Sequence, residues 1–184
     1  EHRDFTAEGY QLLETMAALG YVLDIAHMDT RSANTAIDRY HGTVIASHAN
    51  VRRLLPDLPG ERNLSDDTIR ALFERDGIIG VVPFNKFLRN GWVQGEDRRL
   101  TSLDLLVAHI DDLCQMAGDA LHVGIGSDFD GGFGLQDIPA EMDSIADLQL
   151  IDGLLQKRGY SAQDVQQILG ANWLRMLERN LPQA

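Results

Sequence analysis

Three polar side chains of the kind that bind metals or move protons each follow directly after a short apolar run. They are His27, His48 and Asp128. Two imidazoles and one carboxylate form a reasonable ligand set for a divalent metal ion, provided that the fold brings them together. For each histidine the alternative is a hydrogen-bonded core residue near the end of a strand, and the residue types alone leave both interpretations open.

The segment around Asp128 is the most distinctive in the chain, with the sequence GIGSDFDGG over residues 124–132. A glycine-rich turn after a strand can cradle a phosphate, but the carboxylates of Asp128 and Asp130 would repel one. The acidic pair suits proton transfer or metal binding better. An aspartate in a turn often only accepts hydrogen bonds from nearby backbone amides, and this alternative stays open for Asp130.

Two loops carry further candidate residues. The loop at 48–67 contains several arginines, among them Arg62, and the loop at 84–100 contains Trp92. An arginine beside a site can hold a substrate carboxylate by two parallel hydrogen bonds, whereas most surface arginines are simply solvated. The loop at 84–100 could cover a site, and the role of Trp92 is left open.

The elements that must position these residues follow a regular rhythm. Four short runs are almost continuously apolar, which is typical of strands buried on both faces of a parallel sheet. Apolar residues at helical spacing, with Ser or Thr at the starts and Gly at the ends, predict helices between and after these strands. The expected strands lie at 21–26, 43–47, 78–82 and 121–127, and the expected helices at about 6–19, 30–40, 65–76, 101–117, 144–158 and 161–180.

Strands that alternate with helices predict a parallel α/β protein, either a doubly wound sheet or a (β/α)₈ barrel. The positions of His27, His48 and Asp128 favour the barrel, because its active site lies at the carboxyl ends of its strands. Four strands are half of such a barrel. We therefore predict a half of a (β/α)₈ TIM barrel, with four adjacent parallel strands in chain order and helices on the outer face only.

Composition limits the class of protein. The chain has 184 residues, a formal net charge of −12 and 44% hydrophobic residues, which suits one globular domain. The negative charge argues against a nucleic acid or an anionic membrane as a partner, and no apolar run is long enough to span a membrane. Cys114 is the only cysteine, and no signal peptide pattern is present, so we expect a cytoplasmic location. The first residue is Glu1 and not Met, which predicts a fragment.

The chain resembles the renal (membrane) dipeptidase family of zinc peptidases, in its soluble bacterial branch. The GIGSDFDG segment is highly specific for this family, and the other matching segments are strong together, in the same order and spacing over nearly the whole chain. These segments are LDIAH at 23–27, VIASH at 44–48, RNLSDD at 62–67, GVVPFN at 80–85, HVGIGSDFDG at 122–131 and LGANWLR at 169–175.

The resemblance implies zinc-dependent hydrolysis of dipeptides by a metal-bound hydroxide, often with tolerance of a D-residue at the C-terminal position. It implies that His27 and His48 bind the second zinc of a binuclear pair. It also implies that Arg62 binds the substrate carboxylate, and that Asp128 lies over the metals and is the catalytic residue that handles protons.

The chain departs from the family in one respect. The family also uses a His-x-Asp pair after its first strand and a metal-bridging glutamate, and neither can be placed here. His2 has no aspartate two positions on in a strand, so we do not assign it as a ligand. The resemblance therefore implies that residues 1–184 are the C-terminal half of a metallo-dipeptidase barrel, strands five to eight, without its N-terminal half.

Such a half would carry half of a binuclear site and be inactive alone, and its partner would be the missing half or another copy of the chain. Two alternatives remain for the function. One is a different amidohydrolase-like, metal-dependent hydrolase acting on amides, lactams or esters, and the other is a non-catalytic half-barrel that pairs with another chain. Four further residues are interpreted as structural or core: His41, His109, His122 and Cys114.

Overall fold

The computed structural model of the chain describes residues 5–182, so His2 lies outside the described residues. Four short parallel strands form its centre: β1 (Leu23–Asp24), β2 (Val44–Ile45), β3 (Ile79–Val81) and β4 (Val123–Ile125). β1 pairs with β2 and β3 pairs with β4, and a parallel bridge between Ala46 and Ile79 joins the two pairs. The strands are therefore adjacent, parallel and in chain order, as predicted.

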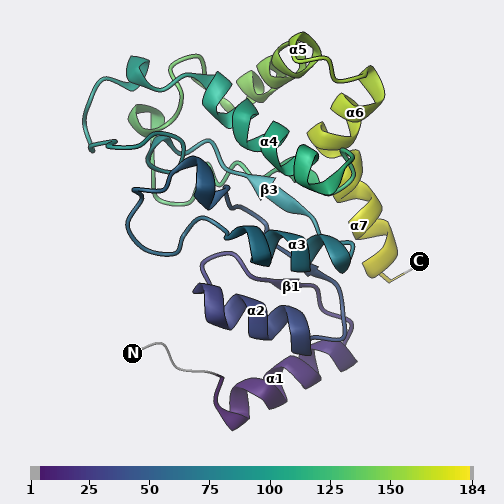
Figure 1. The fold of residues 1–184 in the computed structure, drawn as a ribbon. Helices are drawn as coiled ribbons and strands as arrows, with labels where there is room; N and C mark the ends of the chain where they lie inside the picture. Colours follow the sequence, from purple (N-terminus) through teal and green to yellow (C-terminus); the bar gives the residue numbers. More distant parts are fainter. Residues whose placement is uncertain (1–4, 183–184) are drawn as a thin grey trace.

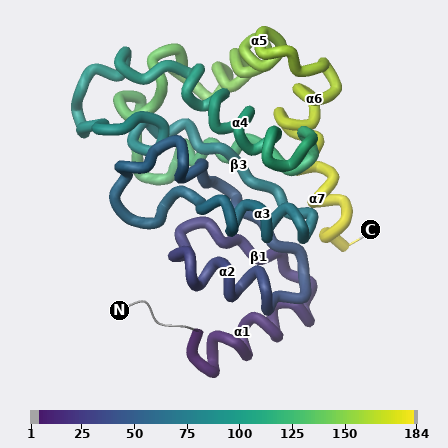
Figure 2. Tube along the Cα trace, in the orientation of Figure 1, coloured from purple at the N-terminus to yellow at the C-terminus, as the bar shows by residue number. Residues whose placement is uncertain are grey.

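The helices also follow the predicted order. The α-helices are α1 (Ala7–Ala18), α2 (Thr30–Arg39), α3 (Asp66–Glu74), α4 (Leu103–Ala117), α5 (Leu150–Lys157), α6 (Ala162–Gln166) and α7 (Asn172–Asn180). Short 3₁₀ turns lie at η1 (Arg52–Leu54), η2 (Asn85–Phe87), η3 (Arg98–Leu100), η4 (Leu135–Asp137) and η5 (Ile145–Gln149), and one π-helical turn lies at η6 (Gln167–Ala171). Successive units lie side by side along the molecule, from α1 to α5 (Figures 1 and 2).

Local sequence accounts for most helix boundaries. The side chains of Thr6, Ser65, Ser102 and Ser161 accept hydrogen bonds from backbone amides in the first turns of α1, α3, α4 and α6. Gly118 ends α4 in the left-handed conformation, at a φ of 81°. The predicted helix at 161–180 is instead broken into α6 and α7, because the wide turn η6 contains Gly170 in a non-helical conformation.

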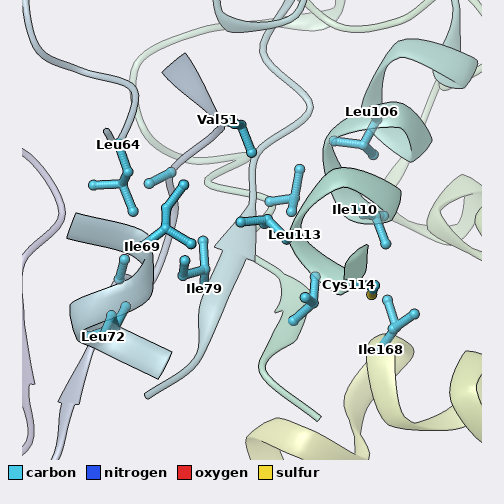
Figure 3. Close-up of a cluster of buried hydrophobic side chains, with 14 of the residues drawn as sticks. Val51, Leu64, Ile69, Leu72, Ile79, Leu106, Ile110, Leu113, Cys114 and Ile168 are labelled. Atoms are coloured by element: carbon cyan, nitrogen blue, oxygen red, sulfur yellow. The ribbon is translucent and has the colours of Figure 1, made fainter. Parts of the chain in front are cut away.

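The main core lies between the strands and helices α2, α3 and α4. Figure 3 shows its centre, where Ile69 and Leu72 of α3 approach Ile79 of β3, with Ile110 and Leu113 of α4 on the other side. Each of these side chains is 0% exposed, and burying one contributes about 1.5–3 kcal/mol. This packing holds the helices on the outer face of the sheet.

A smaller cluster occupies the opposite face of the strands. It consists of Ile45, Ile78 and Met176, with Val22 and Trp173 packed against them. Because side chains alternate along a strand, Ile45 points away from the main core that contains its neighbour Val44. Helix α7 therefore packs against the inner face, so the prediction of helices on the outer face only is wrong for this helix, whose apolar residues cover Ile45 and Ile78.

Helix α7 crosses the amino ends of the strands. Thr43 Oγ1, just before β2, donates a 2.7 Å hydrogen bond to Asn180 Oδ1. Arg175 Nη2 donates to the carbonyl of Leu121, just before β4, over 2.7 Å. Arg179 pairs with Asp76, ahead of β3. The helix thus ties three strand starts together on the side opposite to the carboxyl ends.

Helix α7 also occupies the outer edge of β4. The amide of Ile79 bonds to the carbonyl of His122, so the carbonyls of Val123 and Ile125 point away from β3. Asn172 Nδ2 donates to Val123 at 2.7 Å, and Trp173 Nε1 donates to Ile125 at 3.1 Å. These two side chains donate to backbone carbonyls at the strand edge that would otherwise be unpaired.

His109 and Cys114 are core residues, as predicted. The His109 side chain, 1% exposed on α4, accepts a 3.1 Å hydrogen bond at Nδ1 from the amide of Val51. Burial lowers the pKa of His109 from 6.5 to about 4. Burial raises the pKa of the Cys114 thiol to about 12. None of the described helices has the length and apolar character needed to cross a membrane.

Replacing Asn172 by alanine is expected to destabilise the chain. The fully buried Asn172 amide donates to the carbonyls of Ala120 and Val123, and its loss leaves both carbonyls without a partner. We expect the free energy of unfolding to fall by roughly 2–3 kcal/mol, measured by urea denaturation. The exposed Asn90→Ala variant is the control. Equal effects in the two variants would contradict the role of Asn172 on the β4 edge.

His109 is expected to make stability depend on pH. Its pKa is lower in the folded than in the unfolded chain, so its contribution is present above pH 6.5 and lost as the pH falls toward 4. His109→Asn keeps an acceptor but removes the titration. Between about pH 7 and about pH 4.5, the native chain should lose roughly 2–3 kcal/mol more unfolding free energy than this variant. Equal losses of unfolding free energy in the native chain and in His109→Asn would contradict this role of His109.

Candidate active site

His27 and His48 meet at the carboxyl ends of β1 and β2. Their Nε2 atoms are 2.9 Å apart, and the ring centroids are 4.9 Å apart with an interplanar angle of 61°. The parallel pairing of Asp24 with Ile45 brings the ends of the two strands to the same edge of the sheet. The structure therefore places these two predicted ligands in direct contact.

A carboxylate and a hydroxyl lie behind His48. Ser47 Oγ is 2.7 Å from His48 Nδ1 and donates a hydrogen bond to Asp24 Oδ2. Asp24 Oδ1 also accepts from the backbone amide of Ser47 at 2.9 Å and from that of Ala26 at 3.0 Å. Neither Asp24 nor Ser47 was among the site residues predicted from the sequence. The sequence feature that could have identified Asp24 is its charge within an otherwise apolar strand.

Asp128 stands beside this pair. Its Oδ2 atom is 3.7 Å from His48 Nε2, and its side chain is 25% exposed. Asp128 and His27 both have a left-handed backbone, with φ of 50° and 69°, which is uncommon outside glycine and tends to occur at functional sites. Gly131 leaves room for the carboxylate, because a Cβ there would lie 2.2 Å from Asp128 Oδ1.

Arg62 reaches the same place from the loop after β2. Its Nη2 donates a 2.8 Å hydrogen bond to the backbone carbonyl of His48, and its guanidinium lies 5.1 Å from the centre of the Phe87 ring. Burial lowers the pKa of Arg62, while the carboxylates of Asp128 and Asp24 act in the opposite direction. The Nε and Nη1 atoms of Arg62 are buried and have no hydrogen-bond partner.

A pocket of about 350 Å³ connects His27 with Arg62. It is lined by residues at the end of β1 and in the loop before Arg62: His27, Met28, Asp29, Gly60, Glu61 and Arg62. A larger cavity of about 510 Å³ lies between α5, α6 and α7, away from the histidine pair. Of these two, the smaller pocket is lined by both His27, a possible metal ligand, and Arg62, which has two nitrogens without a hydrogen-bond partner.

The surroundings of His48 favour its neutral ring. Burial lowers the pKa of His48, and the positive charge of Arg62 lowers it further, against the opposing effect of Asp128. A neutral imidazole is the form that binds a metal ion. The two facing Nε2 atoms fit zinc, because both Zn–N bonds of about 2.0–2.1 Å can be made to nitrogens this close together.

The described residues near His27 and His48 do not complete a metal-binding site. Among residues 5–182, no group of three or more His, Cys, Asp or Glu side chains that could hold a metal ion is found. His41 is exposed, and His122 contacts the carbonyl of Gly77 at 3.0 Å, away from the pair. The described residues therefore offer two imidazoles, with Asp128 nearby.

An aromatic cluster borders Arg62. Phe84 stacks on Phe133, with centroids 4.6 Å apart, and packs edge-on against Phe87 at 4.8 Å and Trp92 at 5.6 Å. Trp92 thus supports Phe84 in this cluster, and the cluster supports the ring beneath Arg62. Asp130 is exposed at the turn after Asp128.

Comparison with known proteins connects this arrangement to one family. The family model for membrane dipeptidases, peptidase family M19, matches residues 1–182. A Klebsiella pneumoniae protein encoded in the pqqA 5′ region is 33% identical over 94% of this chain and 60% of its own length. The dipeptidase tcpJ of Claviceps purpurea is 27% identical over 96% of this chain and 38% of its own length.

Solved structures show the same fold. A metallopeptidase from Rhodobacter sphaeroides, solved with a phosphinate mimic of the dipeptide L-Ala-D-Ala, superposes with a TM-score of 0.85 at 24% identity. The match covers 98% of this chain and 48% of that one. A dipeptidase structure of peptidase family M19 gives a TM-score of 0.84 over 97% of this chain and 50% of that one. The chain spans about half the length of the solved structures it matches.

Proposed function

The chain belongs to the membrane dipeptidase family, peptidase family M19, and we propose that it forms one half of a zinc-dependent dipeptidase. One observation carries the proposal. Arg62 has two buried nitrogens without an acceptor, and it lines the same pocket as His27. A dipeptide has a free carboxylate that would satisfy these donors while its peptide bond lies toward the histidine pair.

Each side chain has a separate task in this proposal. His27 and His48 bind zinc through Nε2, as part of a binuclear site. Zinc held there would polarise the peptide carbonyl of the substrate and lower the pKa of a bound water. Arg62 fixes the substrate carboxylate, which holds the peptide bond in one orientation. Asp128, whose Oδ2 is 3.7 Å from His48 Nε2, carries a proton to the leaving amine.

The ligand bound to the R. sphaeroides metallopeptidase suggests the substrate class. That structure holds a mimic of L-Ala-D-Ala, and we propose that this enzyme also accepts dipeptides with a C-terminal D-residue. Arg62 recognises the carboxylate and does not depend on the configuration of the preceding carbon. Which side chains of the dipeptide are preferred depends on the other residues that line the pocket.

The remaining ligands come from outside the described residues in this proposal. The partner is the N-terminal half of the barrel, whether in the same polypeptide or separate, and a second copy of this chain is the alternative. β1 lies at one edge of the four described strands and offers that edge for pairing. A cytoplasmic location remains a prediction.

Zinc binding tests the metal part of the proposal. We expect this chain alone to bind zinc weakly or not at all, because two imidazoles and a nearby carboxylate are fewer ligands than a binuclear site needs. Any weak binding seen by calorimetry should disappear in His27→Ala and His48→Ala and persist in the His41→Ala control. Tight binding of two zinc ions per chain would contradict the half-site.

Two substitutions in the full-length enzyme separate binding from chemistry. Arg62→Ala should weaken dipeptide binding by roughly 2–3 kcal/mol, through the loss of a paired carboxylate contact. Asp128→Asn should leave binding nearly unchanged and reduce turnover by about 10²-fold or more, because an amide does not carry the proton. The measurement is hydrolysis of L-Ala-D-Ala with added zinc.

Matched controls accompany these variants. Arg70→Ala removes an exposed arginine of α3, and Asp130→Asn removes the other carboxylate of the turn; both should retain near-native activity. This chain alone should not hydrolyse the dipeptide. Zinc-dependent activity of the chain alone would contradict the half-site, and a full-length enzyme that cleaves only other amides, lactams or esters would favour a different amidohydrolase-like reaction.

A further inference from the structure

Asp24, Ser47 and His48 form a continuous hydrogen-bonded chain across β1 and β2. Asp24 Oδ1 accepts from the backbone amides of Ala26 and Ser47, at 3.0 and 2.9 Å. These two contacts turn Oδ2 toward Ser47 Oγ, which is also 2.7 Å from His48 Nδ1. The three side chains thus lead from a carboxylate held by backbone amides to the ring of a proposed metal ligand.

The direction of each hydrogen bond follows from counting protons. A carboxylate only accepts, so Ser47 must donate its single hydroxyl proton to Asp24. The contact between Ser47 Oγ and His48 Nδ1 then requires a proton on Nδ1. A neutral imidazole has one N–H, so Nε2 of His48 carries a lone pair. That lone pair faces His27 Nε2 at 2.9 Å.

We propose that Asp24 and Ser47 are positioning residues that fix the tautomer of His48 and so keep its Nε2 available to a metal ion. This inference rests on the proposed metal-binding function of His48. A ligating histidine commonly donates its second N–H to a hydrogen-bond acceptor, which orients the ring and raises its basicity. Here Ser47 is that acceptor, and Asp24 determines which way the Ser47 hydroxyl points.

The proposal also assigns the tautomer of His27 in the metal-free chain. The 2.9 Å contact between the two Nε2 atoms needs one proton between them. His48 has none at Nε2, so His27 supplies it. Metal binding then requires only His27 to move its proton to Nδ1, whereas His48 is already in the binding form.

Asp24→Asn is the most informative substitution. The backbone amides of Ala26 and Ser47 both need an acceptor, which keeps the Asn oxygen at the position of Oδ1 and directs its NH₂ group to Ser47 Oγ. Ser47 then accepts from this NH₂ and donates its own proton to His48 Nδ1. The ring proton moves to Nε2, so one nearly isosteric change reverses the tautomer of His48.

Nitrogen-15 NMR of the histidine rings in the metal-free chain tests this directly, at a pH where the rings are neutral. We expect a protonated Nδ1 on His48 and a protonated Nε2 on His27 in the native chain. Asp24→Asn should show a protonated Nε2 on His48. A native His48 protonated at Nε2, or a folded Asp24→Asn chain with an unchanged tautomer, would overturn the proposal.

Three further variants separate positioning from a general effect on the fold. Ser47→Thr keeps the hydroxyl and should keep the native tautomer. Ser47→Ala removes the acceptor of the Nδ1 proton and should give a mixture of tautomers. Asp38→Asn changes the same charge on the exposed side of α2 and should have no effect on His48. If Asp24→Asn fails to fold, the contrast between Ser47→Thr and Ser47→Ala decides, and equal His48 spectra in those two would overturn the proposal.

The metal readout uses the full-length protein, where the remaining ligands are present. Zinc affinity, measured by competition with a chelator, should fall by roughly 10–100-fold in Asp24→Asn and stay near the native value in Ser47→Thr. Native affinity in Asp24→Asn would overturn the proposal. If zinc does not perturb His27 and His48 in the native protein, the proposed function fails, while the metal-free spectra still report the tautomers independently.

Discussion

The parallel pairing of the four strands is the constraint on which the site depends. Parallel strands place all their carboxyl ends at one edge, so residues that follow β1, β2 and β4 meet there although they are far apart in the chain. The register also matters, because pairing of Asp24 with Ile45 puts the Asp24 carboxylate within reach of Ser47, two residues after Ile45. A shift of one residue would turn Asp24 to the other face.

Gly80 of β3 and Gly126, directly after β4, allow the chain segments to approach closely beneath His48. A Cβ on Gly80 would lie 2.1 Å from the carbonyl oxygen of Ser47, and one on Gly126 would lie 2.0 Å from the same atom. Any larger residue at either position would push away the backbone that carries His48. The glycine-rich segment therefore serves close packing around the site, which agrees with the argument from the sequence against a phosphate cradle.

The site is held rigid by contacts on several sides. The left-handed backbone at His27 and Asp128 has an energetic cost on the order of 1–3 kcal/mol per residue, and the surrounding contacts must offset it. A hydrogen bond to Ser47, which itself donates to Asp24, orients His48, and Phe87 and the His48 carbonyl orient Arg62. Helix α7 fixes the opposite ends of the strands, so the carboxyl ends remain free to carry functional groups.

The strand and helix order, most helix starts and the meeting of His27 with His48 were predictable from the amino-acid sequence. These features depend on local signals: apolar runs, capping residues, and the rule that parallel strands align their ends. Three other features of the molecule follow only from its tertiary packing. They are the contact of Asp24 with Ser47, the unused donors of Arg62, and the use of Asn172 and Trp173 on the edge of β4. The first and third join residues at least 23 positions apart, and the second depends on the absence of an acceptor beside a buried atom. Neither leaves a periodic pattern in the chain.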